Sequence, residues 1–179
     1  FPVGKGDGGY CLFLGRMSPD KGPHRAIAAA EKAGVPLLMA AKCREAWEIP
    51  FFEEHVKPHL SDTIRYLGEV PHEEKLELLA GATALLNPIR WNEPFGLVMI
   101  EALACGTPVL AFAEGAAPEI VQDGVTGFLC ANEDAMARDI GRAGELDRTA
   151  CRAAVENYFS TERMVVEHVA LFETMIAPE

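Results

Sequence analysis

The sequence predicts an α/β fold in which a doubly wound, Rossmann-like parallel sheet forms one core. Short apolar runs alternate along the chain with segments that have the apolar spacing of helices, and this alternation is typical of βαβ units. The runs are apolar throughout, as strands buried on both faces of a parallel sheet are. A length of 179 residues with 49% hydrophobic residues suits a single domain.

Each expected element has its own local signal. Strands are expected where apolar runs end at turn residues, over 10–14, 35–41, 63–67, 84–87, 109–112 and 127–130. Helices are expected over 24–33, 45–57, 71–80, 97–104, 133–144, 148–157 and 161–176, with one helical turn at 118–121. Pro71 suits the first turn of its helix, whereas Pro50 is expected to break the helix that contains it. Ligands are expected at the carboxyl ends of the strands.

The stretch from residue 91 to 111, WNEPFGLVMIEALACGTPVLA, carries most of the chemistry. Glu93 precedes the expected helix 97–104, and Glu101 lies within it among apolar residues, where a charge needs a partner. A helix N-terminus that follows a glycine offers backbone N–H groups to an anion. Carboxylates beside such a site are suited to accept hydrogen bonds from sugar hydroxyls. The residues therefore predict a ligand with a phosphate between two polyols, which describes a nucleotide sugar.

The block EPFGLVMIEALACGTPV resembles the E-x(7)-E signature of retaining glycosyltransferases of the GT-B fold, in glycosyltransferase family 4. The match includes the internal F-G and the trailing E-A-x-A-x-G-x-P-V. The resemblance implies that the chain is the C-terminal, donor-binding half of such an enzyme. It implies that Glu93 binds the transferred sugar and that Glu101 binds the ribose.

Other positions acquire roles through the same resemblance. The loop from Gly15 to Gly22, GRMSPDKG, is similar to the family pattern G-R-x-x-x-x-K-G, which implies that Arg16 and Lys21 hold the diphosphate as it leaves. On the residues alone, two solvated loop cations are the favoured interpretation, and the resemblance reverses it. The remaining implied donor contacts are backbone groups of Phe95, Gly96 and Leu97 toward phosphate or sugar, of Gly15 in the basic loop, and of Val70 toward the base.

Three further expectations concern this site. Phe95 is expected to belong to the core as well as to the site, and Trp91 either stacks on a sugar or packs against the sheet. The turn from Gly115 to Glu119 resembles a G-G-x-P-E turn that closes over the donor, but Ala116 replaces its second glycine, which weakens the match. No D-x-D pair stands at a strand end, so we expect no metal and no other cofactor.

The composition of the chain narrows its possible binding partners and its cellular compartment. A net charge of −11 disfavours a general nucleic-acid-binding surface. The five cysteines lack a disulfide or metal-site spacing, which fits buried thiols in the cytoplasm. No apolar run reaches membrane-spanning length, although peripheral contact with a membrane stays open.

The expected organisation is a linker remnant over 1–9, a nucleotide-sugar-binding domain over 10–160 and a C-terminal crossing helix over 161–179. The chain begins at Phe1 with a glycine-rich stretch, so we expect a piece of a longer enzyme whose N-terminal acceptor domain is missing. In the family the last helix crosses back to that domain, and part of its apolar stripe is expected to be uncovered here, or covered by a neighbouring copy.

The function expected from the sequence is retaining hexosyl transfer from a nucleoside diphosphate sugar, with UDP as the first choice and GDP or ADP as alternatives. The isolated domain should bind the donor but transfer poorly. Two other functions stay open, an isomerase similar to nucleotide-sugar 2-epimerases and a noncatalytic module that binds a nucleotide sugar. The sequence does not distinguish the sugar, the base or the acceptor.

Overall fold

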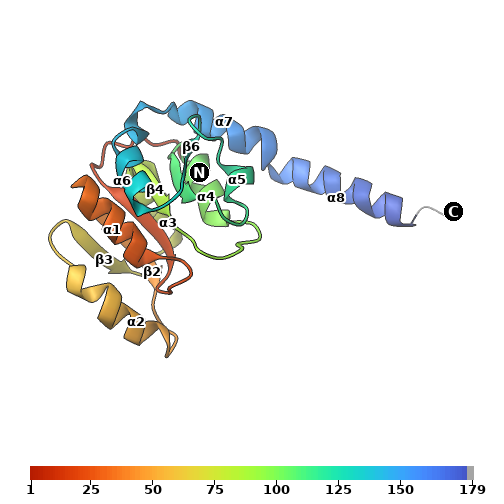
Figure 1. Cartoon of the computed structure of the whole chain (residues 1–179). Coiled ribbons are helices and arrows are strands. Elements are labelled where there is room, and N and C mark those ends of the chain that lie inside the picture. Colours follow the sequence, from red (N-terminus) through yellow and green to blue (C-terminus); the bar gives the residue numbers. More distant parts are fainter. Residues whose placement is uncertain (177–179) are drawn as a thin grey trace.

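The computed structural model describes residues 1–176, which form one parallel sheet with helices on both faces (Figure 1). The strands are β1 (Cys11–Arg16), β2 (Leu37–Lys42), β3 (Ile64–Gly68), β4 (Ala84–Asn87), β5 (Val109–Phe112) and β6 (Gly127–Cys130). Their order in space is β3-β2-β1-β4-β5-β6, and every pair is parallel. The direction of winding reverses between β1 and β4, where ligands of such sheets bind. The predicted doubly wound α/β fold is confirmed.

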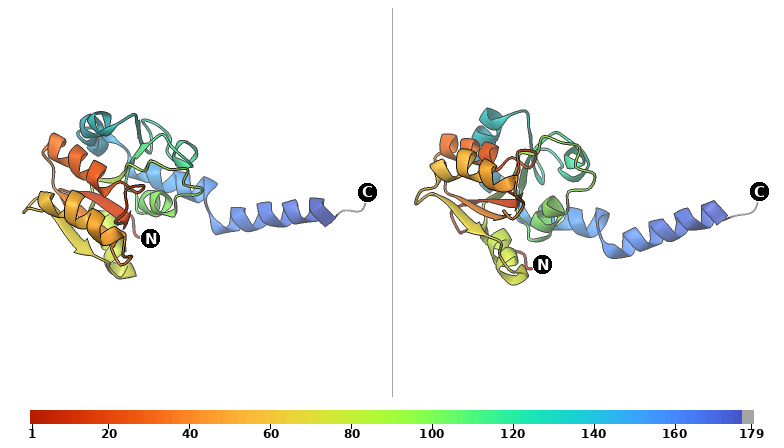
Figure 2. Two further views of the ribbon diagram at one scale, coloured as in Figure 1. Left: turned by 60° about the horizontal axis from the view of Figure 1, so that its bottom comes forward. Right: turned by 90° about the horizontal axis from the view of Figure 1, so that it is seen from below.

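Helices cover the two faces of the sheet in separate layers (Figure 2). The longer helices are α1 (Pro23–Ala33), α2 (Glu48–His55), α3 (His72–Gly81), α4 (Leu97–Ala104), α6 (Glu133–Ile140), α7 (Arg148–Tyr158) and α8 (Thr161–Ile176). Short turns of helix are η1 (Lys57–His59), α5 (Ala117–Ile120) and η2 (Ala143–Glu145). Helices α1, α2 and α6 pack on one face, and α3, α4, α5 and α7 pack on the other.

Successive residues of each strand supply the two cores. In β1, Cys11 and Phe13 are buried with α1 and α6, whereas Leu12 and Leu14 are buried with α3 and α4. This alternation follows from the two-residue period of a strand. It explains why the strands are apolar at every position rather than at every second one.

Two predicted helices differ from those observed. Helix α2 begins at Glu48, so Pro50 lies in its first turn and does not break it. A proline is accommodated there because backbone N–H groups of the first turn have no partner within the helix. The segment predicted as one helix over 133–144 is divided, since α6 ends at Ile140 and a separate short 3₁₀ turn follows.

The N-terminal segment is held against the domain. Backbone N–H groups of Gly4, Gly6 and Gly8 donate to carbonyls of Cys105, Ala80 and Gly81 at 3.0, 3.1 and 2.9 Å. These bonds tie the segment predicted as a linker remnant to the ends of α3 and α4. The domain boundaries at residues 9 and 160 stay predictions.

Helix α8 projects away from the domain in every view (Figures 1 and 2). All its residues are exposed, including Phe172 at 57% and Met175 at 73%. The expected uncovered apolar stripe is thus confirmed, while the crossing to another domain stays a prediction. Residues 177–179 of the predicted segment lie outside the described residues. Within 1–176, no helix combines the length and the apolar character needed to span a membrane.

Candidate functional site

Apart from Arg16, the predicted site residues gather at the carboxyl edge of the sheet, around the first turn of α4. Two pockets of about 240 Å³ each open there. The first, which we call the sugar-side pocket, contains Lys21, Glu93 and Gly96. The second, the ribose-side pocket, contains Val70 and Glu101. The two pockets share the lining residues Leu14, Gly15 and Val98, so one elongated ligand could occupy both.

Lys21 and Glu93 form an ion pair in the sugar-side pocket. The Lys21 ammonium donates to Oε2 of Glu93, and both side chains are only 18% exposed. Trp91 donates from Nε1 to the same oxygen at 3.0 Å, and its ring lies 5.4 Å from the Lys21 nitrogen. Because Trp91 is 43% exposed, it does not pack against the sheet. Its indole N–H instead holds the Glu93 carboxylate.

The backbone of Glu93 is fixed by the turn after β5. The amide of Ala116 donates to the Glu93 carbonyl at 2.9 Å. Gly115 has a φ of 56°, and a Cβ there would lie 2.5 Å from the Glu93 nitrogen. The turn therefore needs a glycine at 115 and accepts an alanine at 116, so the departure from the family pattern leaves the contact with Glu93 intact.

The first turn of α4 presents its backbone to the sugar-side pocket. Gly96 precedes the helix with a φ of 77°, and a Cβ at this residue would meet Met99 at 2.3 Å. Phe95 and Leu97 also line the pocket, with side chains 53% and 65% exposed. The expectation that Phe95 belongs to the core is therefore wrong. Free N–H groups at a helix N-terminus suit an anion at this place.

Glu101 has a partner that the sequence did not indicate. Lys75 on α3 donates from Nζ to Oε1 of Glu101 at 2.6 Å, and their side chains are 25% and 23% exposed. Both residues line the ribose-side pocket. The charge expected to need a partner in the apolar helix has one, which comes from the neighbouring helix.

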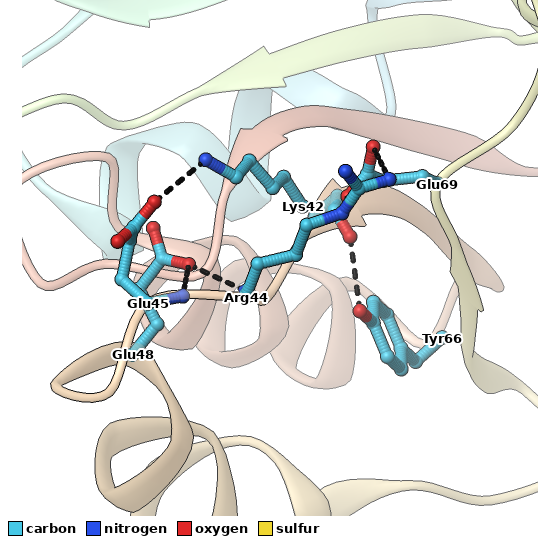
Figure 3. Close-up of polar contacts among 7 residues, drawn as sticks. Lys42, Arg44, Glu45, Glu48, Tyr66 and Glu69 are labelled. Carbon is cyan, nitrogen blue, oxygen red and sulfur yellow. Dashed lines mark hydrogen bonds and ion pairs between the residues drawn. The ribbon is translucent and has the colours of Figure 1, made fainter.

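Residues of the turns after β2 and β3 are joined by polar contacts (Figure 3), and Glu69 and Val70 of the second turn line the ribose-side pocket. Arg44 and Glu69 join the two turns through contacts of 2.5 and 2.8 Å. Buried Glu48 accepts from the amides of Arg44 and Glu45 at 2.8 and 3.0 Å. Tyr66 donates to the Ala41 carbonyl at 2.9 Å, and burial raises the pKa of its phenol. These bonds fix the backbone around Val70.

Arg16 does not join Lys21 in either pocket. Its guanidinium is 44% exposed and lies 3.8 Å from the carboxylate of Asp20. The loop that carries both cations is instead tied to the loop before α4. Arg25 donates to the carbonyls of Pro88 and Pro19 at 2.8 and 2.9 Å, and this brings Lys21 beside Glu93.

Sequence reasoning missed Lys75, Arg25 and Asn87. Asn87 ends β4, is 6% exposed and lines the sugar-side pocket. Lys75 left one signal, because it is a cation in the first turns of an acidic helix, where positive charge is disfavoured. Arg25 left none, since its partners are backbone carbonyls. Within residues 1–176, no cluster of three His, Cys, Asp or Glu side chains suited to a metal ion was found.

Comparison with known proteins gives a consistent picture. Residues 3–157 match the family described as "Glycosyl transferases group 1". Glycogen synthase of Mycobacterium tuberculosis is 36% identical over 129 residues, which are 69% of this chain and 30% of that protein. D-inositol 3-phosphate glycosyltransferase of Frankia alni is 35% identical over 140 residues, which are 72% of this chain and 34% of that protein.

Solved structures agree on the fold. Sucrose-phosphate synthase from Thermosynechococcus elongatus superposes with a TM-score of 0.84 at 26% identity, over 98% of this chain and 49% of that one. A glycosyltransferase involved in avilamycin A biosynthesis gives 0.75 at 30% identity, over 90% and 49%. HepE of Anabaena, solved with UDP and glucose, gives 0.75 at 23% identity, over 91% and 48%. The chain thus spans about half of these structures and about a third of the curated relatives.

Proposed function

This chain belongs to the group 1 glycosyl transferases of the GT-B fold, and from that premise we propose that it binds the nucleoside diphosphate sugar in a retaining glycosyl transfer. We place it in glycosyltransferase family 4 on the residues of its E-x(7)-E block. The activity of the whole enzyme, its sugar and its acceptor belong to this proposal, because the chain spans only part of its relatives.

One arrangement carries the proposal. Glu93 and Glu101 lie in two pockets that meet at Gly15, beside the free N–H groups that begin α4. A diphosphate at that N-terminus would place its sugar toward Glu93 and its ribose toward Glu101. The two carboxylates accept hydrogen bonds from hydroxyls, and the intervening site attracts an anion.

In this proposal the positive groups of the site stabilise the leaving group. When the anomeric bond breaks, negative charge grows on the diphosphate, and Lys21 and the α4 amides lie where they can stabilise it. Arg16 would contribute only if its guanidinium leaves Asp20 when the donor binds. We propose that these positive groups make a metal ion or another cofactor unnecessary.

Glu93 is proposed as a ligand of the transferred sugar, not as a nucleophile. Its carboxylate is engaged by Lys21 and Trp91, whereas the nucleophile of a retaining hydrolase attacks the anomeric carbon directly. Retention would then arise from return of the acceptor on the face from which the diphosphate leaves. The isomerase alternative is not favoured, because the relatives named above are synthases and glycosyltransferases.

UDP is the first nucleotide to test, since HepE was solved with UDP and with UDP-glucose. We expect UDP, or failing that GDP or ADP, to bind in the presence of EDTA and to raise the melting temperature by mass action. Calorimetric titration of all three ligands, with EDTA and with Mg²⁺, measures this. Binding that requires Mg²⁺ would contradict the metal-free account, and the absence of binding by all three would contradict the proposed function.

A further inference from the structure

The ion pair between Lys75 and Glu101 joins two helices inside the ribose-side pocket. Lys75 lies among Glu73, Glu74 and Glu77 on α3, yet its ammonium contacts the carboxylate of the neighbouring helix at 2.6 Å. A cation in the first turns of a helix opposes the helix dipole. Its position is therefore not explained by the stability of its own helix.

The pair leaves hydrogen-bonding capacity free on both partners. Lys75 binds Oε1 of Glu101, and among residues 1–176 no hydrogen bond to Oε2 was found. A carboxylate has about four acceptor positions and an ammonium has three donors. A free carboxylate oxygen and free ammonium donors thus lie side by side in one pocket. Two neighbouring hydroxyls, each of which can donate and accept, complement this arrangement.

We propose that Lys75 is a positioning residue that holds the Glu101 carboxylate toward the vicinal hydroxyls of the ribose. The pair then distinguishes a ribonucleoside diphosphate from its 2′-deoxy counterpart. This inference rests on the proposed function, because it assumes that a nucleoside diphosphate occupies the ribose-side pocket. It adds a residue on α3 and a selectivity to the two glutamates of the E-x(7)-E block.

The test is the ratio of affinities for UDP and 2′-deoxy-UDP, measured by calorimetry for the wild-type chain and for Lys75→Met. Both ligands carry the same charge, so the general loss of one positive charge cancels in the ratio. We expect the wild type to prefer UDP by about tenfold or more, which corresponds to one hydrogen bond to a charged group. Lys75→Met should reduce the preference to within about threefold of unity, since Glu101 is then no longer held.

Two further variants separate positioning from folding. Lys75→Arg keeps a cation with several donors and should retain a preference for UDP. Lys32→Met removes an equivalent charge from an exposed pair with Asp134, whose side chains are both 59% exposed, and should leave the ratio unchanged. Thermal unfolding of each variant reports whether the domain still folds, and Lys75→Gln replaces Lys75→Met if the latter does not.

The outcomes are distinct. A variant at Lys75 that melts at a lower temperature but keeps the preference would show an inter-helix contact only and would overturn the inference. A wild-type chain that binds UDP and 2′-deoxy-UDP equally would overturn it as well. If the wild type prefers GDP or ADP, the same ratio is measured with that base. A wild type that binds no nucleoside diphosphate would refute the proposed function itself.

Discussion

Glu93→Gln is expected to separate binding of the nucleotide from binding of the sugar. The substitution keeps the shape of the side chain and an oxygen for the Trp91 Nε1–H, while it removes the charge that engages Lys21. The contacts of the Gly115 turn involve only the backbone of residue 93, so they persist. Lys21 is then released toward the diphosphate.

The size of the effect follows from the exposure of the pair. Exposed ion pairs contribute about 0–1 kcal/mol, and this pair is only 18% exposed on each side, so a value of about 1 kcal/mol is reasonable. Release of Lys21 should therefore strengthen UDP binding about fivefold. A sugar-bearing donor gains the same amount but loses a hydrogen bond to a charged group, which costs about 1.5–3 kcal/mol. The preference for UDP-glucose over UDP should fall about tenfold or more.

Calorimetric titration of UDP and UDP-glucose at one ionic strength measures both quantities. Glu114→Gln is the matched control, because Glu114 pairs with Arg90 on the same edge and lines neither pocket. Its affinity ratio should equal that of the wild type. If Glu93→Gln weakened UDP as strongly as UDP-glucose, Glu93 would not be a sugar ligand. A lower melting temperature with an unchanged ratio would assign it a structural role.

Two further predictions concern stability. Arg148 donates to four backbone carbonyls and to the Thr107 hydroxyl at 2.7–3.5 Å. Arg148→Met should therefore lower the free energy of unfolding by about 3 kcal/mol in urea titrations. The exposed control Arg138→Met should change it by less than about 0.5 kcal/mol. A loss below 1 kcal/mol would refute this role. Burial lowers the pKa of His24 to about 4 from its usual 6.5, so the folded state favours the neutral ring. Between pH 6.5 and 4 the unfolded chain takes up a proton at this ring that the folded chain does not, so the free energy of unfolding falls as pH drops through this interval. His24→Gln should flatten that loss, which urea titrations at several pH values measure.

The fold was predictable because its local signals do not conflict. The strands 84–87, 109–112 and 127–130 were predicted with the bounds observed, since apolar runs there stand between helices and turns. The error at Pro50 came from reading the proline without knowing where its helix begins. The same residue breaks a helix interior and suits a first turn, and only the tertiary position of Glu48 decides between the two.

The site was predictable where its chemistry follows the chain and not where it depends on packing. Glu93 and Glu101 lie on one loop and helix with seven residues between them, so their spacing is visible in the sequence. Lys75 is 26 residues from Glu101, and its role depends on how α3 lies beside α4. Gly115 follows β5 and Glu93 follows β4, so their close contact depends on how these two strands pair. A Cβ at residue 115 would meet the backbone of Glu93, and the sequence alone does not show this contact.

Helix α8 has a consequence for how this chain can be observed. It extends about 24 Å at 1.5 Å per residue, and none of its residues is buried by the part of the chain that the structure describes. Internal contacts such as the Arg163–Glu167 pair at 2.6 Å add only a few tenths of a kcal/mol, and isolated helices of this length are marginal in water. Its amide hydrogens should therefore exchange with solvent far faster than those of α7, which share the protection of the core. Slowed exchange confined to residues 161–176 would then report directly that another surface has come to rest on the helix.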